Sequence, residues 1–593
     1  MIRHNLNLGL RTGLILLFFV HTSNANAQSV EQLNRSNISV SWEQAIGIYS
    51  KLDSLHSEAK MFEAGSTDVG TPLHVFVISA DGDFDIQKAR EQQKAVVLIN
   101  NGIHPGEPDG IDASIRMSEK LLNNKKLIPK NILICIIPIY NIDGSINARC
   151  CTRANQNGPI IQGFRGNARN LDLNRDFIKC DSENAKSFTK IFRYWNPDVF
   201  IDTHVSNGSD YQHVMTLIST QHNKLGGELG AFLKNTMTPA LFLAMEKRGF
   251  PMAPYVNTRK YDHPPEGGIY GFMETPRYAS GYAALYGSLS FVTETHMLKP
   301  FPLRVEATLA LLEEILSFTA SNREAILKKR KNSLSQWSKN TQHPIEWKVD
   351  TTKIEKIRFQ GYAHYYQKSP VTGQDQLYYD RKKPFTKDVS FYDEYAGSIT
   401  IDVPKFYVVP QAWREVIERL QLNRVQMSKL KNDTVVELST YRIGEYKTTS
   451  GPYEGHYVHS DTKIESETKP IRLFAGDWFI PTDQDAFRYI VETLEPHGPD
   501  SFFSWGFFDS ILQQKEWFSG YVFDGMAEQL LKEDPQLKKR FEDKKANDPE
   551  FSKSAFEQLY FIYRNSEWFE DLHRYPVYRV SQDASFDELL LAP

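Results

Sequence analysis

The sequence predicts an α/β protein whose first half forms a mixed, mostly parallel sheet flanked by helices. Two features of residues 40–318 predict this fold: short apolar runs alternate with longer stretches of helical periodicity, and several runs are β-branched with almost no polar interruption. Unbroken apolar runs are typical of strands covered on both faces. Strands that alternate with helices indicate a sheet with helices on each side, and ligand sites in such sheets lie beyond the carboxyl ends of the strands.

The individual elements follow from these patterns. Five apolar runs are predicted as strands and two periodic stretches as helices. The predicted strands are 73–78, 95–100, 132–139, 199–203 and 289–293, and the predicted helices are 41–52 and 108–123.

The first 27 residues have the pattern of a cleavable secretory signal. Arg3 and Arg11 precede and flank an apolar run, no acid is present, and Ala25-Asn26-Ala27 supplies a small-x-small exit. The run is too short to span a bilayer, which needs about 20 apolar residues. We therefore expect export, with cleavage near Ala27, to the periplasm or the extracellular space.

The remaining chain divides into three predicted parts. An α/β domain covers 28–325, a charged and Ser-rich linker covers 326–345, and an accessory region covers 346–593. The accessory region is β-rich to about residue 475, apart from a helix at 410–422, and then aromatic-rich and helical. For the aromatic cluster at 502–508 we favour a packed core or domain interface over a surface that stacks on carbohydrate.

Composition excludes several classes of protein. Lys and Arg total 69 against 73 Asp and Glu, so a net charge of -4 supplies no basic surface for nucleic acid. The sequence also lacks a serine elbow, a Walker loop, an H-E-x-x-H motif and a dinucleotide-binding glycine fingerprint.

Four cysteines are too few for a disulfide framework. Cys150 and Cys151 are adjacent, a strained geometry for pairing with each other. Either one of them bridges to Cys135 or Cys180, or the cysteines are small buried thiols.

Two histidines and one carboxylate form a candidate metal site. His104 and Glu107 have H-x-x-E spacing, which is weak evidence alone, but His104 also leaves a predicted strand and enters a helix. His204 ends another predicted strand. Two His and one carboxylate are a zinc set that leaves a fourth position open for water. The alternatives are a turn histidine at 104 and a strand-end histidine at 204, each satisfied by the core.

Two further segments carry polar residues that are candidates for substrate binding or catalysis. In 170–177, alternation places Asp172, Asn174 and Asp176 on one side, and Arg175 has the planar fork that suits a carboxylate. The alternative is a charged loop held by its own Asp–Arg pairs. Glu294 ends a buried strand, where an acid has no structural reason to be unless it is paired or catalytic.

Four motifs follow one another along the chain: the His-x-x-Glu pair at 104–107, the Asp-Leu-Asn-Arg segment at 172–175, the strand-end His204 and the strand-end Glu294. In this order they resemble the motifs of the zinc carboxypeptidase family that includes carboxypeptidases A and D. The segment 138–144 is also similar to that family's. The resemblance covers about 42–318 and leaves the accessory region unexplained. Together with the leader, it suggests a secreted bacterial member of the family with a C-terminal accessory region.

The resemblance implies roles for individual residues. The ligands of one zinc ion per chain fall on His104, Glu107 and His204, and the general base falls on Glu294. The groups that bind the substrate's free C-terminal carboxylate fall on Asn174 and Arg175. The oxyanion-stabilising arginine falls on Arg165 by its spacing in the carboxypeptidase D branch, with Arg153 and Arg169 as rivals, and the substrate-binding tyrosine falls on Tyr278 or Tyr282.

The predicted function is that of a zinc metallocarboxypeptidase. It would hydrolyse the C-terminal bond of peptides or proteins through a metal-activated water, with no nucleic-acid partner and no membrane span in the mature chain. The alternatives are a zinc amidohydrolase or cell-wall stem-peptide peptidase on the same scaffold, and an inactive peptide-binding relative. The floor of the specificity pocket falls between 255 and 284, where no residue can be assigned.

Overall fold

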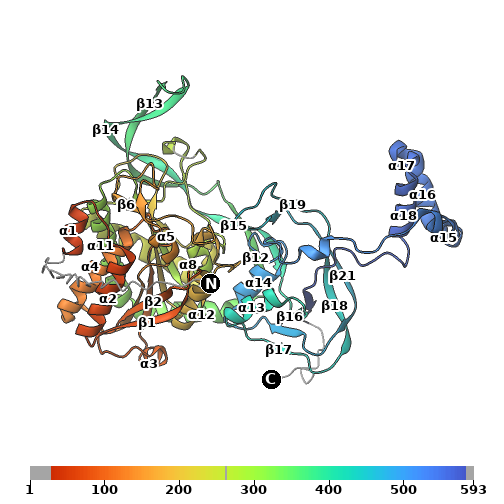
Figure 1. Cartoon of the computed structure of the whole chain (residues 1–593), viewed down its shortest axis with the longest axis horizontal. Helices are drawn as coiled ribbons and strands as arrows, with labels where there is room; N and C mark the ends of the chain where they lie inside the picture. The colour runs from red at the N-terminus through yellow and green to blue at the C-terminus, as the bar shows by residue number, and fades with distance from the viewer. Residues whose placement is uncertain (1–27, 261–262, 583–593) are drawn as a thin grey trace, which may run out of the picture.

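The computed structural model describes residues 28–260 and 263–582. The predicted signal at 1–27 lies outside these residues. Within them, no helix is both long and apolar enough to cross a membrane. The α/β half and the accessory region lie side by side (Figure 1).

An eight-stranded sheet organises the first half, in the order β1-β2-β4-β3-β7-β11-β8-β9. The central strands β4, β3, β7 and β11 are mutually parallel, and β1, β2 and β8 add antiparallel neighbours. Every predicted strand is present, so the predicted α/β class is confirmed. The strands are β1 (Ala59–Ser66), β2 (Pro72–Ile78), β3 (Ala95–Asn100), β4 (Ile132–Ile137), β7 (Val199–Ser206), β8 (Met215–Ser219), β9 (Ala253–Pro254) and β11 (Leu289–His296).

Helices cover both faces of this sheet. On one face α4 (Asp109–Asn123) packs on α11 (Phe301–Ser321), and on the other lie α6 (Glu183–Trp195) and α10 (Ala279–Ala284). The start of α4 lies very close to β7, because a Cβ at Gly110 would overlap the Thr203 side chain. This contact fixes the loop between β3 and α4 above the sheet. The helix α2 (Trp42–Leu55) packs against α4 from outside.

The accessory region has its own sheet, with the strand order β17-β22-β16-β23-β18-β21. Two of its strands lie beyond residue 475, so the C-terminal part is less purely helical than predicted. The strands are β16 (Phe406–Val409), β17 (Ser428–Lys429), β18 (Thr434–Ile443), β21 (Ile464–Leu473), β22 (Trp478–Pro481) and β23 (Tyr578–Val580). The predicted helix at 410–422 is α13 (Arg414–Leu422), and α14 (Phe487–Leu494) lies near it.

Two further units extend from this body (Figure 1). The long hairpin of β13 (Glu355–Lys368) and β14 (Asp375–Tyr392) is bound at its base by the Gln212 side chain, which donates to the Gly361 and Phe385 carbonyls. A four-helix lobe with its own apolar cluster stands at the far end. Its helices are α15 (Gly520–Glu533), α16 (Pro535–Asn547), α17 (Pro549–Lys553) and α18 (Ala555–Arg564).

The segment 326–345, predicted as a linker, has regular secondary structure. Most of it forms α12 (Arg323–Trp337), and the rest begins β12 (Gln342–Val349), which pairs with β15 (Tyr395–Asp402). Arg330, one of the consecutive basic residues at 328–331, is buried and binds Asp198 at 2.9 Å. Arg330 is therefore part of the packed interior, although the charged composition of the segment favours an exposed position.

The predicted cysteine cross-bridge is wrong. Cys150 and Cys151 are bonded to each other on the exposed hairpin of β5 (Arg149–Cys150) and β6 (Ile161–Gln162). Cys135 and Cys180 are buried free thiols, which agrees with the alternative prediction of small buried thiols. Cys135 lies inside β4, where a surface hairpin cannot reach it.

The two halves share one apolar core. The aromatic cluster at 502–508 contributes four fully buried rings, so the predicted packed core is confirmed. Asn423, at the end of α13, accepts hydrogen bonds from the hydroxyls of Tyr282 and Tyr286, both at 2.7 Å. The accessory region is therefore fastened to helix α10 and its neighbours by buried polar contacts as well as by apolar packing.

Asn423→Ala should destabilise the full chain by about 2–4 kcal/mol, because it leaves two buried hydroxyls without an acceptor. Urea unfolding measures the change. Asn432→Ala, at an exposed position of the same region, is the control and should shift the midpoint little. Equal midpoints for both variants would contradict the proposed coupling.

Candidate active site

A polar cavity of about 230 Å³ lies at the carboxyl ends of β7 and β11. Its walls contain most of the residues singled out in the sequence. The predicted site residues that line it are His104, Glu107, Arg165, Asn174, Arg175, His204, Tyr278 and Glu294. They come from five separate segments of the chain, which the sheet brings together.

Three buried side chains converge at the base of this cavity. His104, Glu107 and His204 each present one donor atom, and these atoms lie within 4.8 Å of one another. His104 and Glu107 stand on the turn between β3 and α4, where the Glu107 N–H donates to the His104 carbonyl at 2.8 Å. His204 lies near the end of β7.

Buried carboxylates orient the two imidazoles. His104 Nε2 lies 2.9 Å from Asp172, and His204 Nε2 lies 2.8 Å from Asp202. Both Nδ1 atoms therefore face Glu107, at 3.4 and 3.3 Å. Histidines that ligate metals bind a carboxylate in this way through their other nitrogen, which fixes the ring and its tautomer.

These residues fit a zinc ion. Two imidazole nitrogens and one carboxylate are the donor set of catalytic zinc sites. His104 Nδ1 is buried and, within the described part of the chain, has no hydrogen-bond partner, so a cation would satisfy it. Burial disfavours the charge of Glu107, but Arg153 and His104 outweigh it and hold its pKa well below the usual range.

Glu294 faces the metal ligands from the neighbouring strand. It is aligned with His204 across the parallel β7–β11 pair. Its side chain is partly exposed on the cavity side. The surrounding sheet withdraws it from bulk water, which raises its pKa to about 8.

The three arginine candidates separate in space. Arg165 lines the cavity and binds Asp172 at 2.9 Å. Arg153 lies 2.7 Å from Glu107, against the ligand itself. Arg169 donates to the carbonyl of Asp181 and is exposed. Of the three, Arg165 is therefore the one at the cavity wall, where a substrate can reach it.

The two tyrosine candidates also separate. Tyr278 lines the cavity, and the Arg175 guanidinium lies 4.4 Å from its ring centre. Tyr282 is fully buried beneath it and is bonded to Asn423, so it cannot contact a substrate in this conformation. The two residues differ in backbone conformation, because Tyr278 is the extended residue that precedes α10, whereas Tyr282 lies inside the helix.

One further acid, not predicted from the sequence, belongs to the cavity. Glu274 is buried in the wall together with Tyr255 and Phe272. It accepts hydrogen bonds from the backbone N–H and the hydroxyl of Ser280, and burial raises its pKa. The sequence feature that could have identified Glu274 is its position, since it is an acid within an apolar part of the 255–284 interval.

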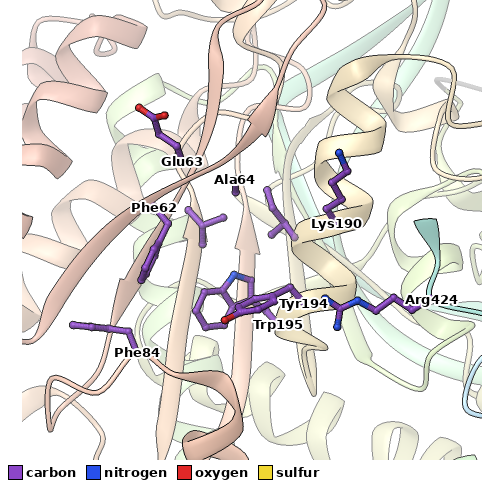
Figure 2. A pocket seen from close by; sticks show the side chains of 10 residues that line it. Phe62, Glu63, Ala64, Phe84, Lys190, Tyr194, Trp195 and Arg424 are labelled. Atoms are coloured by element: carbon purple, nitrogen blue, oxygen red, sulfur yellow. The ribbon is translucent and has the colours of Figure 1, made fainter. Parts of the chain in front are cut away.

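A larger cavity, of about 320 Å³, lies elsewhere, between β1 and α6. Figure 2 shows its aromatic walls, Phe62, Phe84, Tyr194 and Trp195, with Lys190 and Arg424 at one side. Among the described residues that line it, none is a predicted site residue. Size alone therefore does not identify the active site, whereas the converging donors do.

The purified chain should contain about one zinc per molecule, removable by a chelator. His204→Ala should lower zinc affinity at least about 100-fold, since it removes one of three ligands. Elemental analysis and metal titration measure this. His222→Ala is the matched control, because His222 also lies beside carboxylates, Asp393 and Glu394, but is not among the described residues that line the cavity. Full zinc content in His204→Ala would show that the site is misassigned.

Comparison with known proteins agrees with this geometry. Residues 48–214 match the sequence profile of the family described as zinc carboxypeptidase. Carboxypeptidase 2 of Trichophyton tonsurans is 21% identical over 433 residues, which cover 70% of this chain and 74% of that protein. Carboxypeptidase 2 of Trichophyton rubrum is 20% identical over 437 residues, covering 70% and 74%.

Among solved structures, a putative carboxypeptidase A from Shewanella denitrificans OS-217 is 18% identical with a TM-score of 0.36, covering 46% of this chain and 69% of that one. Carboxypeptidase A from Helicoverpa armigera is 14% identical with a TM-score of 0.37, covering 49% and 75%. The matched profile contains the three metal ligands and ends before Glu294. The segment 48–214, with its intact His–Glu–His ligand set, therefore matches the zinc carboxypeptidase family.

Proposed function

We propose that this protein removes C-terminal residues from peptides or proteins that end in a free carboxylate. The observation that carries the proposal is the shared cavity: the metal ligands, the Glu294 carboxylate and the Arg175 fork line the same walls. The first two groups are needed to hydrolyse an amide, and the fork restricts the position of the bond that is cut.

The proposed mechanism assigns each group one task. A zinc ion held by His104, Glu107 and His204 would act as a Lewis acid for the scissile carbonyl, lower the pKa of a water molecule and favour the ionised form of Glu294. Glu294 takes the proton of the water and delivers it to the leaving amine. Arg165 donates hydrogen bonds to the oxyanion, a contribution that typically amounts to about 10²–10³ in rate.

Asn174 and Arg175 hold the terminal carboxylate of the substrate in this proposal. Arg175 provides paired donors in a fixed plane, and its guanidinium packs on the Tyr278 ring. Holding the chain end there brings only the last peptide bond to the water. Tyr278 completes the wall beside the bound residue.

We also propose that the protein is exported from a bacterial cell and acts outside its cytoplasm. The support is the leader at 1–27, with its basic start, apolar run and Ala-Asn-Ala exit. Cell fractionation followed by N-terminal sequencing tests this. We expect a new N-terminus near Gln28 on protein found outside the cytoplasm, and retention of the protein in the cytoplasm would contradict the proposal.

Glu294→Gln should lower kcat by about 10²–10⁴ while zinc content stays near one per chain, because the amide cannot accept the proton. Steady-state hydrolysis of a free-acid peptide measures the loss. Glu266→Gln, an identical exchange at an exposed position in a short 3-10 helix, is the control. Undiminished activity in Glu294→Gln would remove the assigned base, and an inactive zinc-loaded parent would favour the peptide-binding alternative.

Amidation of the substrate's C-terminus should lower kcat/KM by about 100-fold or more, because Arg175 loses its charged partner. Acetylation of the N-terminus of the same peptide is the matched control and should have little effect. Equal cleavage of acid and amide would mean that Arg175 does not clamp a terminal carboxylate, as in an amidohydrolase or endopeptidase.

A further inference from the structure

A tight turn of the accessory region reaches the rim of the active-site cavity. It lies between β19 (Lys447–Thr448) and β20 (His459–Ser460), and we name it the 453–456 turn. Tyr453 and His456 exchange backbone hydrogen bonds of 2.7 and 3.0 Å. Glu454 and Gly455 both have positive φ, 51° and 85°, as in the two-residue turns that fit a twisted hairpin.

Three side chains of this turn bind the segment that carries the carboxylate clamp. The Glu454 carboxylate accepts the backbone N–H of Asp172 at 2.8 Å. The Tyr453 hydroxyl accepts the Arg175 Nε–H at 3.0 Å. His456 lies 2.7 Å from Asp181. The turn therefore touches both the arginine that holds substrate and the loop whose Asp172 orients His104.

Arg175 is held on three sides. Its Nε donates to Tyr453, its Nη1 donates to the Asn174 carbonyl at 2.8 Å, and its flat face lies on Tyr278. Among the described residues, no hydrogen-bond partner is found for the remaining nitrogen, Nη2. A substrate carboxylate can therefore bind there without displacing an existing contact.

The hydroxyl of Tyr453 opposes a competing contact. Asp172 lies 4.0 Å from Arg175 Nη1, close enough to attract the guanidinium away from the substrate position. An acceptor at Nε fixes the plane of the fork at the other end. Without it, Arg175 is free to rotate toward Asp172.

Tyr453 is itself fixed by neighbours from both halves of the chain. Its ring is nearly parallel to Trp505, at 6.2 Å and 19°. The Arg277 guanidinium lies 5.7 Å from the Tyr453 ring and 4.8 Å from the Trp505 ring, and it binds Asp500 at 2.6 Å. Arg277 immediately precedes Tyr278, so the same bonds that hold the turn also hold the second wall of the clamp.

We propose that the accessory region completes the carboxylate-binding subsite and that Tyr453 is the positioning residue that orients Arg175 for the substrate's terminal carboxylate. This inference rests on the proposed carboxypeptidase function. It gives the accessory region a direct part in substrate binding, although the residue acts through Arg175 and does not touch the reacting atoms.

Tyr453→Phe tests the inference in the full-length, zinc-loaded enzyme, because it removes one hydroxyl and keeps the ring between its neighbours. For a free-acid peptide we expect KM to rise about 10-fold, the effect of losing one hydrogen bond to a charged group, with kcat within about twofold. Hydrolysis of the amidated peptide and the melting temperature should stay unchanged. A purely structural role would lower the rates on both peptides together.

Tyr457→Phe is the matched control, because Tyr457 lies four positions further on and is 53% exposed. It should behave as the parent on both peptides. The inference would be overturned if Tyr453→Phe left KM for the free-acid peptide unchanged, or if it lowered the rates on the acid and the amide equally. The proposed function would still hold in that case, provided that the parent enzyme prefers the free acid. A parent without that preference would overturn both.

Discussion

The site is built around the buried carboxylate of Glu107, which is held between two imidazoles. A charge withdrawn from water costs several kcal/mol unless opposite charge and hydrogen bonds compensate it. In this chain the compensation comes from Arg153 at 2.7 Å and from the two Nδ1 atoms that face it. A divalent cation at the same position would compensate it more fully, and the arrangement is suited to receive one.

The two histidines beside Glu107 are in turn held by carboxylates, Asp202 and Asp172, on their far side. Asp202 belongs to β7 itself, two residues before His204, so the strand's alternation places both on one face. Asp172 comes from a loop, and it also binds Arg165 and lies near Arg175. One loop residue thereby links the metal site to the groups proposed to bind substrate, and the 453–456 turn secures that loop from the accessory side.

Much of this arrangement could be predicted from sequence, for a definite reason. The ligands and Glu294 stand at the ends of strands whose apolar runs are long and unbroken, and parallel neighbours bring such ends to one edge. Tyr282 was indistinguishable from Tyr278 in sequence because both belong to the same short segment, 277–282. In the structure Tyr278 precedes α10 in an extended conformation, whereas Tyr282 lies inside the helix. The buried Arg330 was missed because local sequence does not reveal which distant residue lies opposite it. The vicinal cysteine pair was missed because only the fold shows that the other two cysteines are buried away from it.

The α/β class, the order of the strands along the chain and the His–Glu–His ligand set can all be predicted without coordinates, because they depend on periodicity and on chemistry carried by single residues. The positions of Arg165 at the cavity wall, of Glu274 buried within it and of Tyr453 against Arg175 emerge only when the chain is folded. Those contacts join segments separated by long stretches of chain, and the packing that brings them together is a property of the whole core, which no local pattern encodes.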